Sequence, residues 1–218
     1  MRTQLDEQLL RLNKEMVAMG SAIEQSIVKV CVLLKAKDDE AASKLREEDA
    51  VVDRMEKEIE SLCLRIILMQ QPVAKDLRKV SAALKMITDM ERIGDQAADI
   101  AEILMMPVEG ELMERPVHLD QMGAEAANMV HKAIDAYVKH DLALAQAVQA
   151  DDDKVDALFV KVKHELLEDM KNRPDPGMQL LDTLMIAKYL ERIGDHAVNI
   201  AEWVEYAVNG TYKGEKLG

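Results

Sequence analysis

Two stretches of this chain, about a hundred residues apart, are nearly identical: ERIGDQAADIAE at 91–102 and ERIGDHAVNIAE at 191–202. Aligned from Met90 and Leu190, they agree in nine of thirteen positions. Residues 19–53 match 122–156 more weakly, in eight of thirty-five positions. A repeat of this length within 218 residues predicts two similar units built on the same plan, in which one short stretch has diverged far less than the rest.

The spacing of apolar residues indicates that both units are helical. From Leu5 to Leu33 apolar residues recur in alternating steps of four and three, and the same rhythm runs from Val52 to Met69. Aromatic residues make up only 3% of the chain, which disfavours a sheet. We therefore predict an all-α fold of two tandem, similar three-helix bundles with six long helices.

Prolines and glycines set the boundaries between the predicted helices. Pro72 ends the second helix, because proline is tolerated in a first helical turn but not in a helix interior. Pro107, Gly110 and Pro116 make a continuous helix unlikely to form between the two units. The expected organisation is a first three-helix repeat over 1–106, a linker over 107–117, a second repeat over 118–208 broken at RPDPG (173–177), and a loose C-terminal tail over 209–218.

Composition narrows the range of partners and locations. The chain has 28 Lys and Arg against 41 Asp and Glu, a net charge of −13, so we expect cations or basic protein surfaces rather than nucleic acid. Cys31 and Cys63 lack the spacing of a metal or redox motif, which predicts free thiols in a reducing compartment. Without a signal peptide or an apolar stretch of about 20 residues, we expect a cytoplasmic protein without direct membrane insertion, associated with the membrane only through partners.

Each predicted unit carries two pairs of acidic residues spaced four apart, which places each pair on one face of a helix. Counting residues from the turn between the helices, at about 1.5 Å per residue, brings the two pairs of each unit to nearly the same level of adjacent antiparallel helices. The first unit supplies Asp49, Asp53, Glu91 and Asp95, and the second supplies Asp152, Asp156, Glu191 and Asp195.

Two interpretations of these carboxylates remain open at this point. They can form a site for hard, oxygen-seeking cations such as Mg²⁺, Mn²⁺ or iron, whereas zinc more often recruits His or Cys. Alternatively, they form a solvated acidic stripe neutralised by Arg92 and Arg192. Equal level along the helices does not by itself make the two pairs face each other. His196 replaces Gln96 of the first copy, so we expect it to be structural or at the surface.

The chain resembles the PhoU family in several motifs. These are the duplicated three-helix plan, LLRLNKEMVAMG (9–20), QQPVAKDLRKV (70–80) and the two ERIGD segments, so that the resemblance covers nearly the whole chain. It implies a protein that is not an enzyme, is often a homodimer, and couples a phosphate ABC transporter to a PhoR-type sensor histidine kinase. Such proteins restrain the phosphate-starvation response when phosphate is plentiful.

The resemblance also implies roles for individual residues. Some family members hold iron or other metal clusters on motifs that correspond here to the eight carboxylates above, with Asp99 and Asn199 as flanking candidates. The resemblance therefore implies that this chain can bind a metal ion such as iron, Mn, Mg or Zn. We further expect Arg92, Arg192, Glu102 and Glu202 to contact partner proteins.

Two other classes of helical protein compete with this interpretation. A ferritin-like metal protein needs Glu-x-x-His on two helices, and neither ERIGD copy supplies it. A spectrin-like structural repeat requires a continuous helix between its units, which Pro107, Gly110 and Pro116 disfavour.

Overall fold

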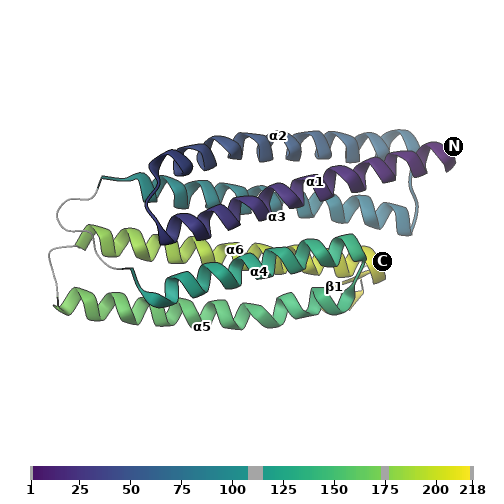
Figure 1. Ribbon diagram of the computed structural model, residues 1–218. Helices are drawn as coiled ribbons and strands as arrows, with labels where there is room; N and C mark the ends of the chain where they lie inside the picture. Colours follow the sequence, from purple (N-terminus) through teal and green to yellow (C-terminus); the bar gives the residue numbers. More distant parts are fainter. Residues whose placement is uncertain (1, 108–114, 173–176, 217–218) are drawn as a thin grey trace.

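The computed structural model describes residues 2–107, 115–172 and 177–216, and these form two three-helix bundles lying side by side (Figure 1). The prediction of an all-α fold with six long helices is confirmed. Most of the predicted linker (108–114) and of the predicted break (173–176) lies outside the described residues. The elements are α1 (Arg2–Lys35), α2 (Asp39–Gln70), α3 (Lys75–Met105), α4 (Val117–Lys139), α5 (Leu142–Asn172), α6 (Gly177–Asn209), β1 (Thr211–Tyr212) and β2 (Glu215–Lys216).

Matching residues of the two repeats begin the second helix of each bundle. The side chain of Asp38 accepts a hydrogen bond from the Ala41 amide at 2.9 Å, which caps α2. Asp141 accepts bonds from the Ala143 and Leu144 amides at 2.8 and 3.2 Å at the start of α5. Because capping satisfies amides that have no partner within the helix, Asp38 and Asp141 fix the same boundary in both halves.

Helices α1 and α4 cross so closely at two glycines that a larger residue at either position would have to push a neighbouring side chain aside. A Cβ on Gly20 would lie 2.8 Å from Cγ2 of Ile134, and one on Gly123 would lie 3.2 Å from Cδ1 of Leu34 and 3.5 Å from Sγ of Cys31. Gly20 corresponds to Gly123 in the repeat alignment, and Cys31 corresponds to Ile134. The same contact is therefore made twice, and it positions the first bundle against the second.

Helices α3 and α6 form the other half of the contact between the bundles. Asp89 of α3 lies 2.8 Å from Nδ1 of His196, and it accepts a hydrogen bond from Nδ2 of Asn199 at 3.0 Å. Tyr189, which corresponds to Asp89, is hydrogen-bonded to Asp99, which corresponds to Asn199. His196 thus has the structural role that was expected, and it holds one bundle to the other.

The C-terminal segment is more ordered than the loose tail predicted from sequence. Residues 211–216 form an antiparallel hairpin, with Gly210 and Gly214 supplying the positive φ angles of 82° and 79°. The ring of Tyr212 stacks on Trp203 of α6, with centroids 4.1 Å apart. Aromatic stacking against α6 gives this short hairpin the support that two strands alone lack.

Helix α1 departs from another expectation. By length and composition alone its segment Thr3–Lys35 could cross a membrane, since its most apolar window of 18 residues has a mean hydropathy of 1.6. About half of that window (44%) is buried in the bundle, where Met16, Ile23 and Ile27 are fully covered. A core helix of a bundle needs the same composition, so this apolar content is weak evidence for a membrane span.

Candidate functional site

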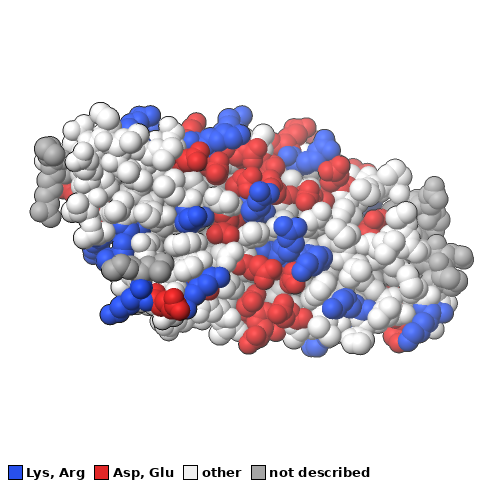
Figure 2. All heavy atoms as spheres, turned by 180° about the vertical axis from the view of Figure 1, so that it is seen from behind, with Lys and Arg blue, Asp and Glu red and all other residues white. Residues whose placement is uncertain are grey.

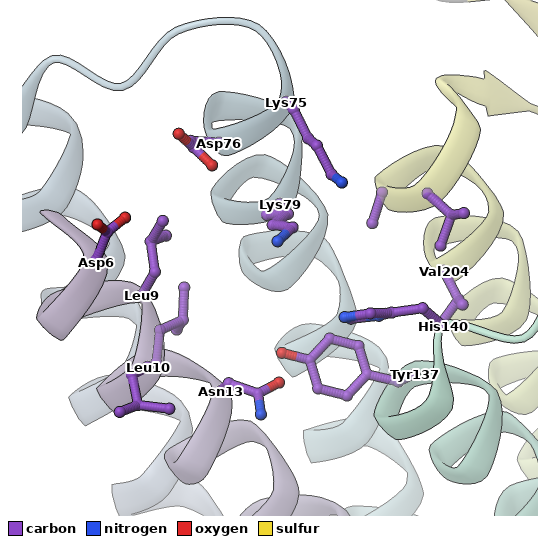
Figure 3. A pocket seen from close by; sticks show the side chains of 13 residues that line it. Asp6, Leu9, Leu10, Asn13, Lys75, Asp76, Lys79, Tyr137, His140 and Val204 are labelled. Carbon is purple, nitrogen blue, oxygen red and sulfur yellow. The ribbon is translucent and has the colours of Figure 1, made fainter. Parts of the chain in front are cut away.

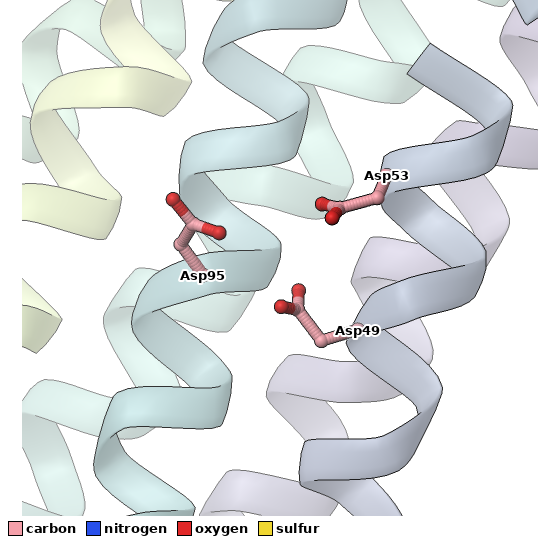
Figure 4. Close-up of side chains that lie close together, drawn as sticks. All are labelled: Asp49, Asp53 and Asp95. Carbon is pink, nitrogen blue, oxygen red and sulfur yellow. The ribbon is translucent and has the colours of Figure 1, made fainter. Parts of the chain in front are cut away.

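The first repeat brings its two acidic pairs together between α2 and α3. Figure 4 shows the carboxylates of Asp49 and Asp53 on α2 pointing towards Asp95 on α3. One oxygen from each of these three residues lies within 4.8 Å of the others. Two oxygens that bind one cation at about 2.0–2.6 Å are separated by no more than about 5 Å, so the three carboxylates are close enough to share an ion. Glu91 lies one turn away from Asp95, and its charge acts on Asp49.

The glycine of the ERIGD motif explains how Asp49 reaches this position. A Cβ on Gly94 would lie 3.0 Å from Oδ1 of Asp49 and 3.2 Å from Cγ1 of Val52. The Asp49 carboxylate therefore lies against the backbone of α3, where any larger residue would displace it. A Cβ on Gly194 in the second repeat would lie 3.5 Å from Oδ1 of Asp152, the equivalent aspartate.

Burial and mutual repulsion disfavour ionisation within the first cluster. Burial, followed by the charges of Asp95 and Asp53, raises the pKa of Asp49 to about 6. Oδ1 of Asp49 is buried and has no hydrogen-bond partner. Burial also raises the pKa of Glu91 and of Asp95, although Arg92 opposes both shifts. A buried carboxylate oxygen that has no hydrogen-bond donor, in a cluster of acids, is suited to receive a cation.

Arg92 is the nearest cation to the first cluster. Its Nη1 lies 3.1 Å from Asp95 and its Nε lies 3.5 Å from Glu91, with about half of the arginine side chain exposed. The neutralising role weighed for Arg92 is therefore visible in the structure. It leaves the buried oxygen of Asp49 unpaired, because the arginine remains on the solvent side of the cluster.

The second repeat assembles the same residue types less tightly. Burial, followed by the charges of Asp156 and Asp195, raises the pKa of Asp152 to about 6, so carboxylates of α5 and α6 lie near enough to influence one another. Lys188, which stands where the first repeat has Thr88, pairs with Glu191. Within the described residues, only the first repeat brings three such oxygens within 4.8 Å of one another.

The two flanking candidates have different surroundings. Asn199 donates its amide to Asp89 at the contact between the bundles, so it is directed at α3 rather than reserved for the second carboxylate cluster. The charge of Asp99 contributes to raising the pKa of Asp49 and of Asp95, which places it in the field of the first cluster. The two repeats therefore differ in charge at this position.

The residues expected to contact partners are not equally accessible. Arg92, Arg192 and Glu102 are exposed. Only 14% of the Glu202 side chain is exposed, and Nζ of Lys213 in the hairpin lies 3.5 Å from its Oε2. The hairpin thus covers the residue that repeats Glu102, and among the four predicted contact residues Glu202 is the least available.

One pair of residues in each bundle has a role that was not anticipated from the sequence. Lys29 of α1 pairs with Glu48 of α2, and Lys132 of α4 pairs with Asp151 of α5 at 2.5 Å. Lys29 aligns with Lys132, and Glu48 aligns with Asp151 as acid for acid. The conserved lysine and acid in the repeat alignment were the sequence signal for this ion pair. The acid, Glu48 or Asp151, directly precedes the first aspartate of each acidic pair.

Figure 2 shows the face formed by α2, α3, α5 and α6, on which acidic side chains gather at mid-length in two groups with basic side chains between them. The acidic residues that raise the pKa of Asp49 lie on α2 and α3. Those that raise the pKa of Asp152 lie on α5 and α6. The two carboxylate clusters therefore lie on one side of the molecule, as a pair of similar acidic areas.

The metal-free protein is expected to become less stable as the pH rises from 4 to 6, relative to a variant that lacks the half-buried acids Asp49 and Asp152. The native pKa values of Asp49 and Asp152 are about 6, against roughly 3.9 in an unfolded chain. The native state therefore binds more protons in this window, so the free energy of unfolding falls as pH rises. The contribution is fully present below pH 4 and is lost above pH 6.

Urea unfolding in EDTA, at several pH values between 4 and 7, measures this dependence. The double variant Asp49→Asn, Asp152→Asn controls for all other titrating groups, because it keeps their shapes and removes the two charges. We expect the variant to gain stability relative to wild type as pH rises. A difference between the two proteins that does not change with pH would contradict the assignment of these pKa values.

Comparison with known proteins identifies relatives of the whole chain. The family model of the PhoU domain matches residues 16–104 and 119–204. A phosphate-specific transport system accessory protein PhoU homolog of Clostridium acetobutylicum is 37% identical over 207 residues, which is 94% of each chain. The phosphate-specific transport system accessory protein PhoU of Escherichia coli (strain K12) is 30% identical over 207 residues, covering 95% of this chain and 86% of that protein.

Solved structures agree with these sequence matches. The crystal structure of PhoU from Pseudomonas aeruginosa superimposes with a TM-score of 0.89 at 34% identity, covering 94% of this chain and 99% of that chain. The phosphate transport system regulatory protein PhoU from Streptococcus pneumoniae gives a TM-score of 0.87 at 26% identity, covering 95% and 98%.

Proposed function

Because the chain belongs to the PhoU family, we propose that it regulates phosphate uptake by joining a phosphate ABC transporter to a PhoR-type sensor histidine kinase and repressing phosphate-starvation genes when phosphate is plentiful. The observation that supports this proposal is the family match over both repeats, to relatives named as accessory proteins of phosphate-specific transport. Those relatives are named accessory proteins rather than enzymes, which fits regulation by binding.

The acidic face formed by α2, α3, α5 and α6 is the surface we propose for these partners (Figure 2). A net charge of −13 favours association with basic protein surfaces, and charge complementarity mainly raises the rate and specificity of association. In this proposal the protein is a cytoplasmic homodimer that reaches the membrane through its partners, with Arg92, Arg192 and Glu102 at the edges of the contact.

We propose that the first cluster holds a hard cation through Asp49, Asp53 and Asp95, with the charge of Glu91 nearby. The fit rests on three convergent oxygens and on the unpartnered, buried oxygen of Asp49. Iron, Mn²⁺ and Mg²⁺ suit a site made only of carboxylates better than zinc does. A bound cation would neutralise the clustered charges and tie α2 to α3.

The second cluster, made of Asp152, Asp156, Glu191 and Asp195, is proposed as a weaker cation site. Lys188 already provides Glu191 with a positive partner, and Asp156 and Asp195 are exposed. A cation would have to displace Lys188 before Glu191 could coordinate that cation.

The double variant Asp95→Ala, Asp195→Ala tests the role of the acidic face in cells. With a phosphate-regulated reporter, we expect the phosphate-starvation genes to be expressed at high phosphate. The control Glu58→Ala, Glu215→Ala makes the same change in net charge at exposed positions away from both clusters, and should repress normally. Normal repression by a well-expressed Asp95→Ala, Asp195→Ala protein would reject the acidic face as the regulatory surface.

A further inference from the structure

A cavity of about 400 Å³ lies at one end of the seam between the two bundles, away from both acidic clusters. It is formed where the N-terminal parts of α1 and α3 meet the C-terminal parts of α4 and α6 (Figure 3). Its volume is in the range of small-molecule sites, which bury most of a ligand in a concave, largely apolar surface with a few polar groups.

One side of this cavity, on α3 and the end of α4, carries two lysines and a histidine, with Asp76 also on the α3 lining. Figure 3 shows Lys75, Lys79 and His140 with their side-chain nitrogens directed into the hollow. In the part of the chain that the structure describes, neither Lys75 nor Lys79 has an ion-pair partner. Two unpaired amines beside an imidazole favour an anionic ligand that carries more than a single charge.

A simple anion would leave the remaining side chains of the lining without contacts. Leu9, Leu12, Val204 and Val208 provide an apolar surface, and Tyr137 adds an aromatic ring that packs edge-on against His140, with centroids 6.4 Å apart. Asp6 and Asn13 lie on the α1 side, where they can accept hydrogen bonds from a ligand. The cavity thus offers a cationic wall, an apolar and aromatic middle, and an accepting edge.

The fold alone does not require this combination of residues. The opposite end of the same seam holds a second hollow, lined by the corresponding parts of the helices. There the repeat alignment places Leu34 where the first hollow has Tyr137, and Lys37 where it has His140. Lys79 corresponds to Gln179. The second hollow also carries cations, Lys35, Lys37 and Arg115, but none of the described residues that line it is aromatic. An aromatic ring beside the cations therefore distinguishes the first hollow from the second.

We propose that this cavity binds a nucleoside phosphate. Lys75, Lys79 and His140 hold the phosphate groups, the nucleoside packs against Tyr137 and the apolar side chains, and its hydroxyl or amino groups donate to Asp6 or Asn13. Inorganic phosphate leaves the apolar lining and Asp6 unmatched, whereas an uncharged apolar ligand leaves two amines without partners. The site goes beyond the proposed adaptor function, because it gives the protein a small-molecule ligand of its own.

Isothermal titration of the full chain with ATP, AMP, adenosine and inorganic phosphate tests this assignment. The buffer contains EDTA, so that metal binding at the acidic clusters does not contribute. We expect ATP and AMP to bind, with adenosine and inorganic phosphate at least about tenfold weaker. The double variant Lys75→Gln, Lys79→Gln should lose at least about tenfold in ATP affinity, whereas Lys85→Gln, an exposed lysine on the same helix outside the cavity, should bind as wild type does.

A second variant, Leu10→Glu, guards against effects on folding. Leu10 lines the cavity but is 58% exposed, so the new charge repels the phosphate without entering the core. Far-UV circular dichroism confirms that each variant is folded. No binding of ATP or AMP at millimolar concentration overturns the proposal, as does binding unchanged in both cavity variants. Inorganic phosphate binding as tightly as ATP overturns the nucleoside part.

Discussion

Asp49→Asn is expected to lower the affinity of the protein for Mn²⁺ by about 100-fold or more. Asp49 is central to the first cluster, because its carboxylate lies against α3 at Gly94 and its charge interacts with Asp53 and Asp95. Losses of up to about 100-fold are typical when a residue that only supports a metal ligand is replaced, so loss of a ligand should cost at least as much. Asparagine keeps the shape of the side chain and removes its charge.

The matched control is Asp152→Asn, at the same position of the second repeat. Since Lys188 pairs with Glu191 and the second cluster does not converge on three oxygens, this variant should retain the tighter Mn²⁺ site. Electron paramagnetic resonance detects free Mn²⁺ during a titration, so one titration of each variant measures the affinities of the tighter and the weaker site. Tight binding by Asp49→Asn, or an equal loss in both variants, would count against a metal site of the proposed composition.

Protein stability separates a lost ligand from a lost fold. Without metal at pH 7, Asp49→Asn should be at least as stable as wild type, because it removes a half-buried carboxylate that its acidic neighbours repel. A variant that is stable and yet fails to bind Mn²⁺ has lost a ligand. A variant that is destabilised even in EDTA would show that Asp49 has a structural partner, contrary to the unpaired oxygen of its side chain.

The acidic clusters were largely predictable because they depend on regular geometry. Helical spacing places Asp49 with Asp53 and Glu91 with Asp95, and counting from the turn predicts their common level. The structure brings Asp49, Asp53 and Asp95 together across α2 and α3. What the count did not supply was the rotation of each helix about its axis, which the close approach at Gly94 fixes.

Contacts between the bundles were not predictable in this way. The periodic pattern identifies which face of a helix is buried, but not which other helix covers it. Nothing in the helical spacing singles out Asp89, whose partners His196 and Asn199 are more than a hundred residues away in the sequence. The hairpin was missed for a similar reason, since Tyr212 is held by Trp203 rather than by its own short strand.

Lys132→Met is expected to lower the free energy of unfolding by about 2–3 kcal/mol. Only 7% of the Asp151 side chain is exposed, and Nζ of Lys132 lies 2.5 Å from its Oδ2. Burial alone would raise the pKa of Asp151, but hydrogen bonds from Lys132 and Lys154 outweigh burial and hold that pKa below its ordinary value. Removing one partner of a buried ion pair commonly costs about 3–5 kcal/mol, and Lys154 at 2.6 Å retains part of the compensation.

The first repeat again supplies the control, because Lys29 makes the same contact with Glu48 where 33% of the acid side chain is exposed. Water can replace the lysine there, so Lys29→Met should cost less than about 1 kcal/mol. Adding Asp151→Leu to Lys132→Met should recover much of the loss, since no buried charge then remains. Urea unfolding of wild type and these three variants at pH 7 measures the effects. Equal losses of stability from Lys29→Met and Lys132→Met would mean that burial of the acid does not set the strength of this contact. Recovery of stability in the double variant would identify the unpaired Asp151 as the cause of the destabilisation.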